Sequence, residues 1–391
     1  MASLGISSRL ADIQPFHVMS LLARARELEA QGRDIVHMEI GEPDFQTPDA
    51  ITQAGIAALK GGKTSYTPAT GLPELRQAIA AYYQSRYGVN ILAEQVVVTP
   101  GSSGALQLVI GLLLDESRSI LLTDPGYPCN RNIVRFVGGK QINVPVDEAT
   151  GYQLTGNLIE QYWQQNSIAA LIASPSNPTG TTVGKQQLED IYNSVNARGG
   201  FLVADEIYHG LEYTAEPLPT AAAVGQNVFV INSFSKYFGM TGWRIGWLIA
   251  PVRLIPELNK LAQNLFLAAS TPAQWAALAA FTPECMQELE SRKEMFRERR
   301  DYLYTALQES GFDIRIKPEG AFYLYANCRF TGMRSEDLAS RLLEEVGVAV
   351  TPGKDFATDG AQDYLRFAYT TDISRLQTGI ERIREFLNKS V

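Results

Sequence analysis

The sequence predicts an α/β protein in which a large domain, with a mostly parallel central sheet flanked by helices, is joined to a smaller α+β domain. Short runs rich in β-branched residues alternate with helical patterns in the middle of the chain. Runs that are apolar nearly throughout are typical of parallel strands buried on both faces. After about Pro283 this alternation ends and a long helical stretch begins. We expect a large domain over residues 46–284 and a small domain that combines residues 1–45 with 285–391.

The expected elements follow this division along the chain. Gly32 is a natural helix end and Pro73 a natural helix start. The expected helices cover residues 18–31, 49–60, 73–87, 104–114, 185–197, 284–309, 335–345 and 373–388. The expected strands cover residues 96–99, 119–123, 169–174, 201–205, 228–233, 245–250 and 364–370.

Composition argues against several classes of function. The chain has 34 basic and 42 acidic residues, a formal net charge of -8 and no long basic run, which disfavours nucleic-acid binding. No run approaches about 18 apolar residues and no signal-peptide core lies near the start, so we expect a cytoplasmic protein without membrane segments. Cys129, Cys285 and Cys328 are too widely spaced for a zinc motif, which predicts no metal site and a reducing compartment.

A lysine in the segment SFSKYFGMTGWRIGW (233–247) is the first candidate for chemistry. Lys236 directly follows an expected strand and two serines. A lysine amine can form an imine with a carbonyl cofactor, whereas the ordinary alternative is a solvent-exposed lysine. Ser233 and Arg244 could then hold a phosphate, because the planar guanidinium matches phosphate oxygens.

Four further polar turns each follow an expected strand. Asp205 ends one strand, and Asn177 and Tyr127 lie in turns after two others. Ser102 and Ser103 stand at a helix start, where backbone N–H groups favour phosphate. Taken singly, these residues have ordinary alternatives, such as a helix cap, a packing aromatic or a turn. Together, their side chains would meet at the carboxyl edge of a parallel sheet, the usual ligand crevice.

In this order, the motifs SNPTG, ADEIY, SFSK and GWRIGW resemble those of the class I/II aminotransferases, which are fold-type I pyridoxal-phosphate enzymes. The resemblance covers essentially the whole chain. It implies that Lys236 forms the internal aldimine with pyridoxal 5'-phosphate and acts as the base, and that Asp205 pairs with the pyridine nitrogen. It also implies that Asn177 and Tyr208 bond the ring oxygen and that Tyr127 stacks on the ring. The residues expected to take the phosphate are Ser102, Ser103, Ser233 and Arg244.

The same resemblance assigns residues to substrate binding and assembly. Arg366, in YLRFAY, matches the arginine that grips the substrate α-carboxylate. Gly41, in GEPDF, matches the glycine that closes over the substrate, and Asn177 contributes to the same site. Tyr66 matches a tyrosine that reaches the phosphate in the neighbouring subunit, which implies a homodimer with shared active sites.

Other polar residues near these motifs have plainer interpretations. His17 lies on the arm that lines the substrate entrance in relatives, but a solvent-facing or structurally bonded histidine is the favoured interpretation. We expect His37 and His209 to be structural. Glu42 and Asp44 belong to a turn and are not interpreted as paired catalytic carboxylates.

The predicted activity is transfer of an amino group from an amino acid to a 2-oxo acid by a ping-pong mechanism. Neutral or hydrophobic amino acids are the favoured substrates, because no Lys or Arg occurs between Lys260 and Arg292 and the stretch at 262–270 is apolar. Some bacterial relatives carry a substrate-binding lysine about two turns into the GSSGAL helix, where this chain has Gly111.

Two alternatives remain open at this point. A C–S β-lyase would use the same lysine and cofactor on the same scaffold. A non-catalytic regulator with an aminotransferase-like domain is the second alternative, but such relatives carry a helix-turn-helix domain, and only about forty residues precede Gly41 here. Fold alone does not decide among these reactions.

Overall fold

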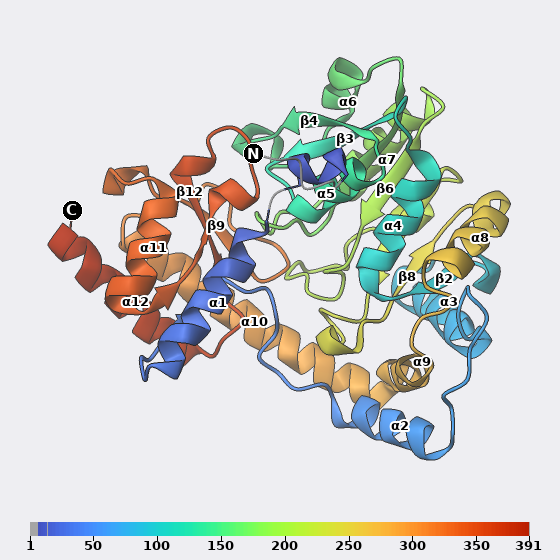
Figure 1. The fold of residues 1–391 in the computed structure, drawn as a ribbon, viewed down its shortest axis with the longest axis horizontal. Coiled ribbons are helices and arrows are strands. Elements are labelled where there is room, and N and C mark those ends of the chain that lie inside the picture. The colour runs from blue at the N-terminus through green and yellow to red at the C-terminus, as the bar shows by residue number, and fades with distance from the viewer. Residues whose placement is uncertain (1–6, 14, 391) are drawn as a thin grey trace.

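The computed structural model describes residues 7–13 and 15–390, and a seven-stranded sheet forms the centre of its larger part (Figure 1). The strands are β2 (Val96–Thr99), β3 (Ser119–Asp124), β4 (Lys140–Pro145), β5 (Ser167–Ala173), β6 (Phe201–Asp205), β7 (Val228–Ser233) and β8 (Gly246–Ile249). Their order is β2-β8-β7-β6-β5-β3-β4, and β8 runs antiparallel to both of its neighbours while the other pairs are parallel. The predicted α/β class and mostly parallel sheet are confirmed.

Helices cover both faces of this sheet because successive strand residues point to opposite sides. Ile120 and Leu122 pack into one apolar cluster with Val109 of α4, whereas Leu121 packs into the other with Ile191 of α7. The helices of this part are α2 (Asp49–Lys60), α3 (Pro73–Tyr87), α4 (Gly101–Leu113), α5 (Pro128–Phe136), α6 (Gly156–Tyr162), α7 (Lys185–Asn196), α8 (Ile255–Leu265) and α9 (Thr271–Leu278).

The N-terminal segment packs beside the C-terminal part of the chain. Strand β1 (Val36–His37) pairs in parallel with β10 (Val348–Ala349), and α1 (His17–Ala30) lies near the same elements (Figure 1). A small antiparallel sheet has the order β11-β12-β9, formed by β11 (Thr351–Pro352), β12 (Tyr364–Ala368) and β9 (Tyr323–Asn327). The surrounding helices are α10 (Pro283–Glu309), α11 (Ser335–Val346) and α12 (Ile373–Ser390). This arrangement agrees with the expected small domain, but the boundaries stay a prediction.

No strand was predicted at β1, β4, β9, β10 or β11, and no helix at α5, α6, α8 or α9. Strand β4 is an edge strand with a polar, mostly half-exposed sequence, so it lacks the apolar run of its neighbours. The missed helices are between 7 and 11 residues long, too short for a clear apolar period.

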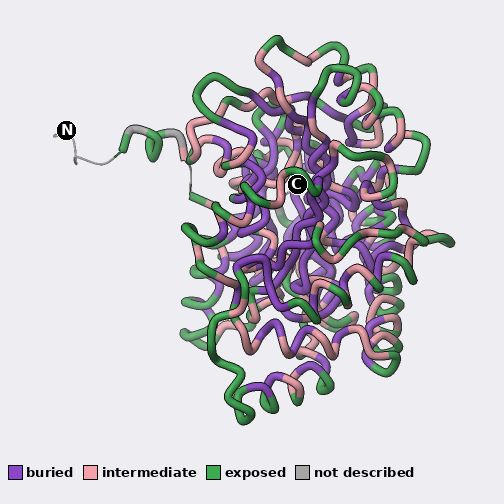
Figure 2. Tube along the Cα trace, turned by 90° about the vertical axis from the view of Figure 1, so that its right-hand side faces the viewer, coloured by how far each residue is buried: buried purple, intermediate pink, exposed green. Residues whose placement is uncertain are grey.

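Buried residues run through the centre of the molecule, and exposed residues lie on the peripheral helices and loops (Figure 2). Among residues 7–13 and 15–390, no helix has both the length and the apolar run that crossing a bilayer requires.

Candidate active site

A cavity of about 220 Å³ opens where the carboxyl ends of the central strands face the small sheet. The sequence-predicted residues that line it are Gly41, Ser102, Ser103, Tyr127, Asn177, Asp205, Tyr208, Ser233, Lys236, Arg244 and Arg366. Tyr66 is not among its lining residues. It lies in the loop between α2 and α3 and is 84% exposed.

Lys236 occupies the turn after β7 and is partly buried. Its Nζ donates a hydrogen bond to the Gly41 carbonyl oxygen at 2.6 Å. Burial lowers the pKa of Lys236 to about 8, helped by the charges of Arg366 and Arg244 and opposed by Glu42. An amine with a lowered pKa is the state in which lysine acts as a nucleophile and a base.

Asp205 ends β6 and is also buried. Burial raises the pKa of Asp205 to about 7, and the neighbouring Glu206 adds to the rise. The bond from Ile207 N–H to Oδ1, at 3.2 Å, and the charge of Lys236 offset only part of this effect. A buried carboxylate in this state fits a ligand that brings a positive charge.

Arg244 and two serines form one end of the cavity beside the start of α4. The Arg244 Nη1 donates to Ser235 Oγ at 3.3 Å and to the Thr241 carbonyl at 2.9 Å, and Ser233 Oγ donates to Ser235 Oγ at 2.9 Å. Gly101, the first residue of α4, permits this approach, because a Cβ there would lie 2.5 Å from Arg244 Nη2. A guanidinium, hydroxyls and a helix N-terminus together suit a phosphate group.

Arg366 forms the opposite end of the cavity from the middle of β12. Its Nη1 donates to Asn177 Oδ1 at 3.0 Å, and its Nη2 donates to the Glu39 carbonyl and to Thr351 Oγ1. The guanidinium lies 4.3 Å from the centre of the Tyr323 ring, while its buried Nε has no partner in the structure. These contacts fix the orientation of a cationic fork that keeps one buried donor, Nε, without a partner.

Several cavity residues were missed by the sequence analysis, of which Tyr323 makes the most contacts. Its hydroxyl lies 2.9 Å from that of Tyr208, and a Cβ added to Gly41 would lie 1.7 Å from the same hydroxyl. Tyr323 sits inside an ordinary apolar strand, which gives no sign of a ligand contact. The other residues missed at the cavity include Phe16, Val18, Met19, Ile40, Leu106, Cys129, Ser235 and Thr241.

The remaining histidines and carboxylates take other contacts. His17 does not line the cavity; its backbone N–H donates to Asp355 Oδ1 at 3.1 Å. His37 Nδ1 lies 2.7 Å from Glu39 Oε1. Asp44 forms an ion pair with Arg299 at 2.8 Å and does not line the cavity.

Gly111 lies outside the cavity lining. It is exposed, and a Cβ built there would meet nothing within 4 Å. Helix α4 instead contributes Ser102, Ser103 and Leu106 to the cavity. The substrate preference drawn from the missing lysine at Gly111 stays a prediction.

Comparisons with known proteins agree with this fold and show the family. The family model described as aminotransferase class I and II matches residues 33–383. A (5-formylfuran-3-yl)methyl phosphate transaminase of Methanocaldococcus jannaschii is 36% identical over 98% of this chain and 100% of its own. A valine–pyruvate aminotransferase of Mycobacterium tuberculosis is 34% identical over 96% of this chain and 97% of its own. An aspartate aminotransferase of Streptomyces avermitilis is 36% identical over 98% of this chain and 97% of its own.

A crystal structure of an aminotransferase from Mycobacterium tuberculosis superposes with a TM-score of 0.95 at 34% identity, covering 99% of this chain and 100% of that one. The fold and the cavity thus define an enzyme of the fold-type I pyridoxal-phosphate class. Within that class, the chain belongs to the class I and II aminotransferases.

The cavity residues fit the cofactor of this family, pyridoxal 5'-phosphate. The cavity offers an amine with a lowered pKa, a cradle for an anion that a Cβ at Gly101 would fill, and a buried carboxylate suited to a protonated ring nitrogen. Across the described residues, no group of three or more His, Cys, Asp or Glu side chains could hold a metal ion.

Proposed function

We propose that this aminotransferase moves the amino group of a neutral or hydrophobic amino acid to a 2-oxo acid by a ping-pong mechanism, in a homodimer located in the cytoplasm. The observation that carries the substrate class is the charge of the cavity. Its cationic side chains, within the part of the chain that the structure describes, are Lys236, Arg244 and Arg366.

Each of these three cations has its own proposed partner, so no cation remains to bind a carboxylate on the substrate side chain. Arg244 would bind the cofactor phosphate, and Lys236 would act at the reacting carbon. Arg366 would bind the substrate α-carboxylate with two N–H groups. The cavity lining also includes the apolar side chains Phe16, Val18, Met19, Ile40 and Leu106. Such a wall favours side chains that carry no charge.

The cofactor supplies a carbonyl that the amino acid condenses with and a ring that withdraws electrons from the substrate Cα. Asp205 would pair with the ring nitrogen, Asn177 and Tyr208 would bond the ring oxygen, and Tyr127 would stack on the ring. The cofactor phosphate would be held by Ser102, Ser103, Ser233 and Arg244.

Lys236 is the catalytic base of this proposal. With a pKa near 8, its Nζ can exist unprotonated at neutral pH, and it would take the proton from the substrate Cα and deliver it to the C4′ carbon of the cofactor. The Gly41 carbonyl, 2.6 Å away, orients the amine, and Gly41 with Tyr323 closes the substrate side against water.

The names of relatives include both a neutral and an acidic amino acid, since one is a valine–pyruvate and another an aspartate aminotransferase. A panel of kcat/KM values over alanine, valine, leucine, methionine, phenylalanine, aspartate and glutamate decides it. The proposal predicts that a neutral amino acid has the highest value. Aspartate above all neutral amino acids would overturn it.

Tyr66 supports the homodimer, because it is exposed and does not line its own cavity. Leu265 and Leu267 are also exposed and apolar. If Tyr66 serves the partner's phosphate, a Tyr66→Ala subunit and a Lys236→Ala subunit complement each other. Mixing and re-associating the two inactive proteins would then restore about one quarter of the sites, by random pairing in a C₂ dimer. No gain over the unmixed variants would show that Tyr66 acts within its own subunit or not at all.

A further inference from the structure

The segment 355–358, which lies between β11 and β12 of the small sheet, is hydrogen-bonded to the elements that follow β3 of the large sheet. Arg131 of α5 donates from Nη2 to the Asp355 carbonyl oxygen at 2.6 Å and from Nη1 to the Phe356 carbonyl oxygen at 3.3 Å. The Gly126 N–H donates to the same Phe356 oxygen at 2.9 Å. Arg131 thus holds two residues that follow it by 224 and 225 positions in the chain.

A second attachment of the same segment lies at the end of β3. Thr358 donates from its N–H at 3.0 Å, and also from its hydroxyl, to the Asp124 carboxylate. Tyr127 and Cys129 stand between these two attachments in the chain and line the active-site cavity. The segment is therefore attached on both sides of the turn that carries Tyr127, the residue proposed to stack on the cofactor ring.

The segment also touches two elements of the substrate side. The Phe356 ring is fully buried, and its centre lies 4.7 Å from the guanidinium of Arg366. The Asp355 carboxylate accepts the backbone N–H groups of His17 and Val18, where α1 begins, and Val18 lines the cavity. A shift of the segment would therefore move both Arg366 and the start of α1 relative to the turn after β3.

We propose that Arg131 is a positioning residue for the substrate. It holds Asp355 and Phe356, which set the start of α1 and the Arg366 guanidinium at a fixed position relative to Tyr127. Arg131 does not line the cavity, so it acts through the segment and not on the substrate. Because a bidentate pair depends on geometry, a small displacement of Arg366 weakens carboxylate binding. This inference rests on the proposed role of Arg366.

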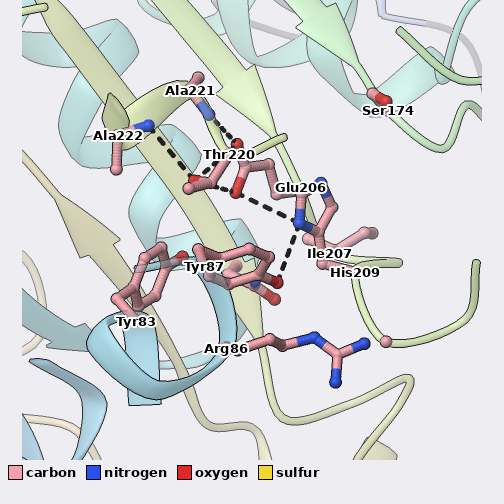
Figure 3. Close-up of polar contacts among 12 residues, drawn as sticks. Tyr83, Arg86, Tyr87, Ser174, Glu206, Ile207, His209, Thr220, Ala221 and Ala222 are labelled. Carbon is pink, nitrogen blue, oxygen red and sulfur yellow. Dashed lines mark hydrogen bonds and ion pairs between the residues drawn. The ribbon is translucent and has the colours of Figure 1, made fainter. Parts of the chain in front are cut away.

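A buried polar cluster next to Asp205 does not share this role. Glu206 accepts hydrogen bonds from Thr220 Oγ1 at 2.8 Å and from the Ala221 N–H at 2.6 Å (Figure 3). These contacts join the residue after β6 to the turn before β7, and both lie in the large sheet's part of the molecule. The cluster therefore holds neither Arg366 nor the start of α1.

The test is the half-reaction of the holoenzyme with its best amino donor from the substrate panel, followed by the cofactor absorbance. The dependence on donor concentration gives an apparent dissociation constant and a maximal rate separately. The reverse half-reaction uses the 2-oxo acid derived from the same donor, which carries the same carboxylate. The variants are Arg131→Gln, which removes the charge and the fork that reaches both carbonyl oxygens, and Arg131→Lys, which keeps a charged donor.

We expect Arg131→Gln to raise the apparent dissociation constants of the donor and of the 2-oxo acid roughly tenfold, the scale of a lost hydrogen bond from a charged group. The maximal rate should stay within about twofold of wild type, because the lost interaction serves binding and not the chemical step. Arg131→Lys should show a smaller rise. The affinity of the apoenzyme for pyridoxal phosphate should not change. A purely structural role would lower the melting temperature or the maximal rate without changing the two dissociation constants.

The matched control is Arg118→Gln. Arg118 also donates to a backbone carbonyl, that of Leu113 at 3.2 Å, but it does not line the cavity, and its variant should keep wild-type constants. Unchanged constants in Arg131→Gln, or an equal rise in Arg118→Gln, would overturn the inference.

If the Arg131 variants do not fold, Thr358→Ala tests the other attachment of the segment. It removes the hydroxyl bond to Asp124 from an exposed loop and should raise both dissociation constants by a smaller factor. No rise would overturn the inference. A wild-type protein that forms no cofactor band, or an Arg366→Lys enzyme with wild-type kinetics, would instead overturn the proposed function, and this inference with it.

Discussion

Arg366 donates a hydrogen bond from Nη1 to the side-chain oxygen of Asn177 at 3.0 Å, and this bond joins the small sheet to the turn after β5 of the large sheet. The two residues are 189 positions apart in the chain. A residue proposed to hold the substrate and one proposed to hold the cofactor ring thus lie in direct contact. The position of the substrate carboxylate is therefore tied to that of the ring.

Replacing Arg366 by lysine tests this link. Lysine keeps the charge but loses the planar fork and its stacking over Tyr323. We expect kcat/KM for the amino donor to fall about 100-fold or more, the usual cost of breaking a buried hydrogen-bonded charge pair. Steady-state kinetics measure this, with Arg297→Lys on the exposed face of α10 as the matched control. Equal values for the two variants would refute the assignment.

Gly41→Ala tests the closeness of Gly41 and Tyr323. The added methyl group would lie 1.7 Å from the Tyr323 hydroxyl, so one of the two segments must move. Because Lys236 donates to the Gly41 carbonyl, the shift also displaces the amine. We expect kcat to fall and the melting temperature to drop.

The control for this variant is Gly111→Ala, on an exposed helix position where a methyl group meets nothing. This change should stabilise the protein by about 0.5–1 kcal/mol and leave turnover intact, because alanine favours helix over glycine. Adding Tyr323→Phe to Gly41→Ala should recover part of the loss. A Gly41→Ala enzyme with wild-type kinetics would contradict this packing.

The sequence predicted the large sheet except its edge strand β4 and most of the cavity lining, because the candidate residues stand in turns directly after strands. Asp205 and Lys236 are examples, each at the end of an apolar run. Tyr323 was not predictable in this way, since it lies inside a strand of the small sheet and reaches the cavity only through tertiary packing. The same holds for Asp355, whose contact with Val18 joins residues 337 positions apart.

The protonation of His37 should contribute to the pH dependence of the free energy of unfolding. Its hydrogen bond to the buried Glu39 raises the pKa of His37 to about 9, against the opposing effect of burial. Since the folded-state pKa exceeds the ordinary value, the protonated ring stabilises the fold. This contribution is complete below about pH 6.5 and is lost as the pH rises through about 9.

His37→Gln should therefore lower the free energy of unfolding at pH 6.5 by about 2 kcal/mol, the scale of a hydrogen bond to a charged group. The difference from wild type should shrink steadily toward pH 10. Urea unfolding at several pH values measures it. A difference that stays constant over this range would mean that His37 contributes by packing and not by charge.

Asp355→Ala should loosen the start of α1, which carries cavity residues. The carboxylate accepts the backbone N–H groups of His17 and Val18 at 3.1 and 2.9 Å, and Phe16, Val18 and Met19 line the cavity. We expect a loss of about 1–3 kcal/mol in stability, the cost of leaving buried donors unsatisfied. The KM for large amino acids should rise while cofactor affinity stays the same.

Asp372→Ala is the matched control, because Asp372 accepts the Arg375 N–H at the start of α12, away from the cavity. It should lose stability by about 1 kcal/mol, as other helix caps do, without a change in KM. If both variants alter KM alike, the effect reflects general stability and not the position of the start of α1.

The most direct test of the central claim is the absorbance spectrum of the purified protein during titration with single amino acids, for wild type and Lys236→Ala. Wild type should show a band at about 410–430 nm that moves toward about 330 nm with its amino donor, as the amino group passes to the cofactor. Lys236→Ala should lack turnover, whereas Lys260→Ala, on the exposed face of α8, should behave as wild type. No band even with added pyridoxal phosphate, or steady transamination by Lys236→Ala without added amines, would contradict the account.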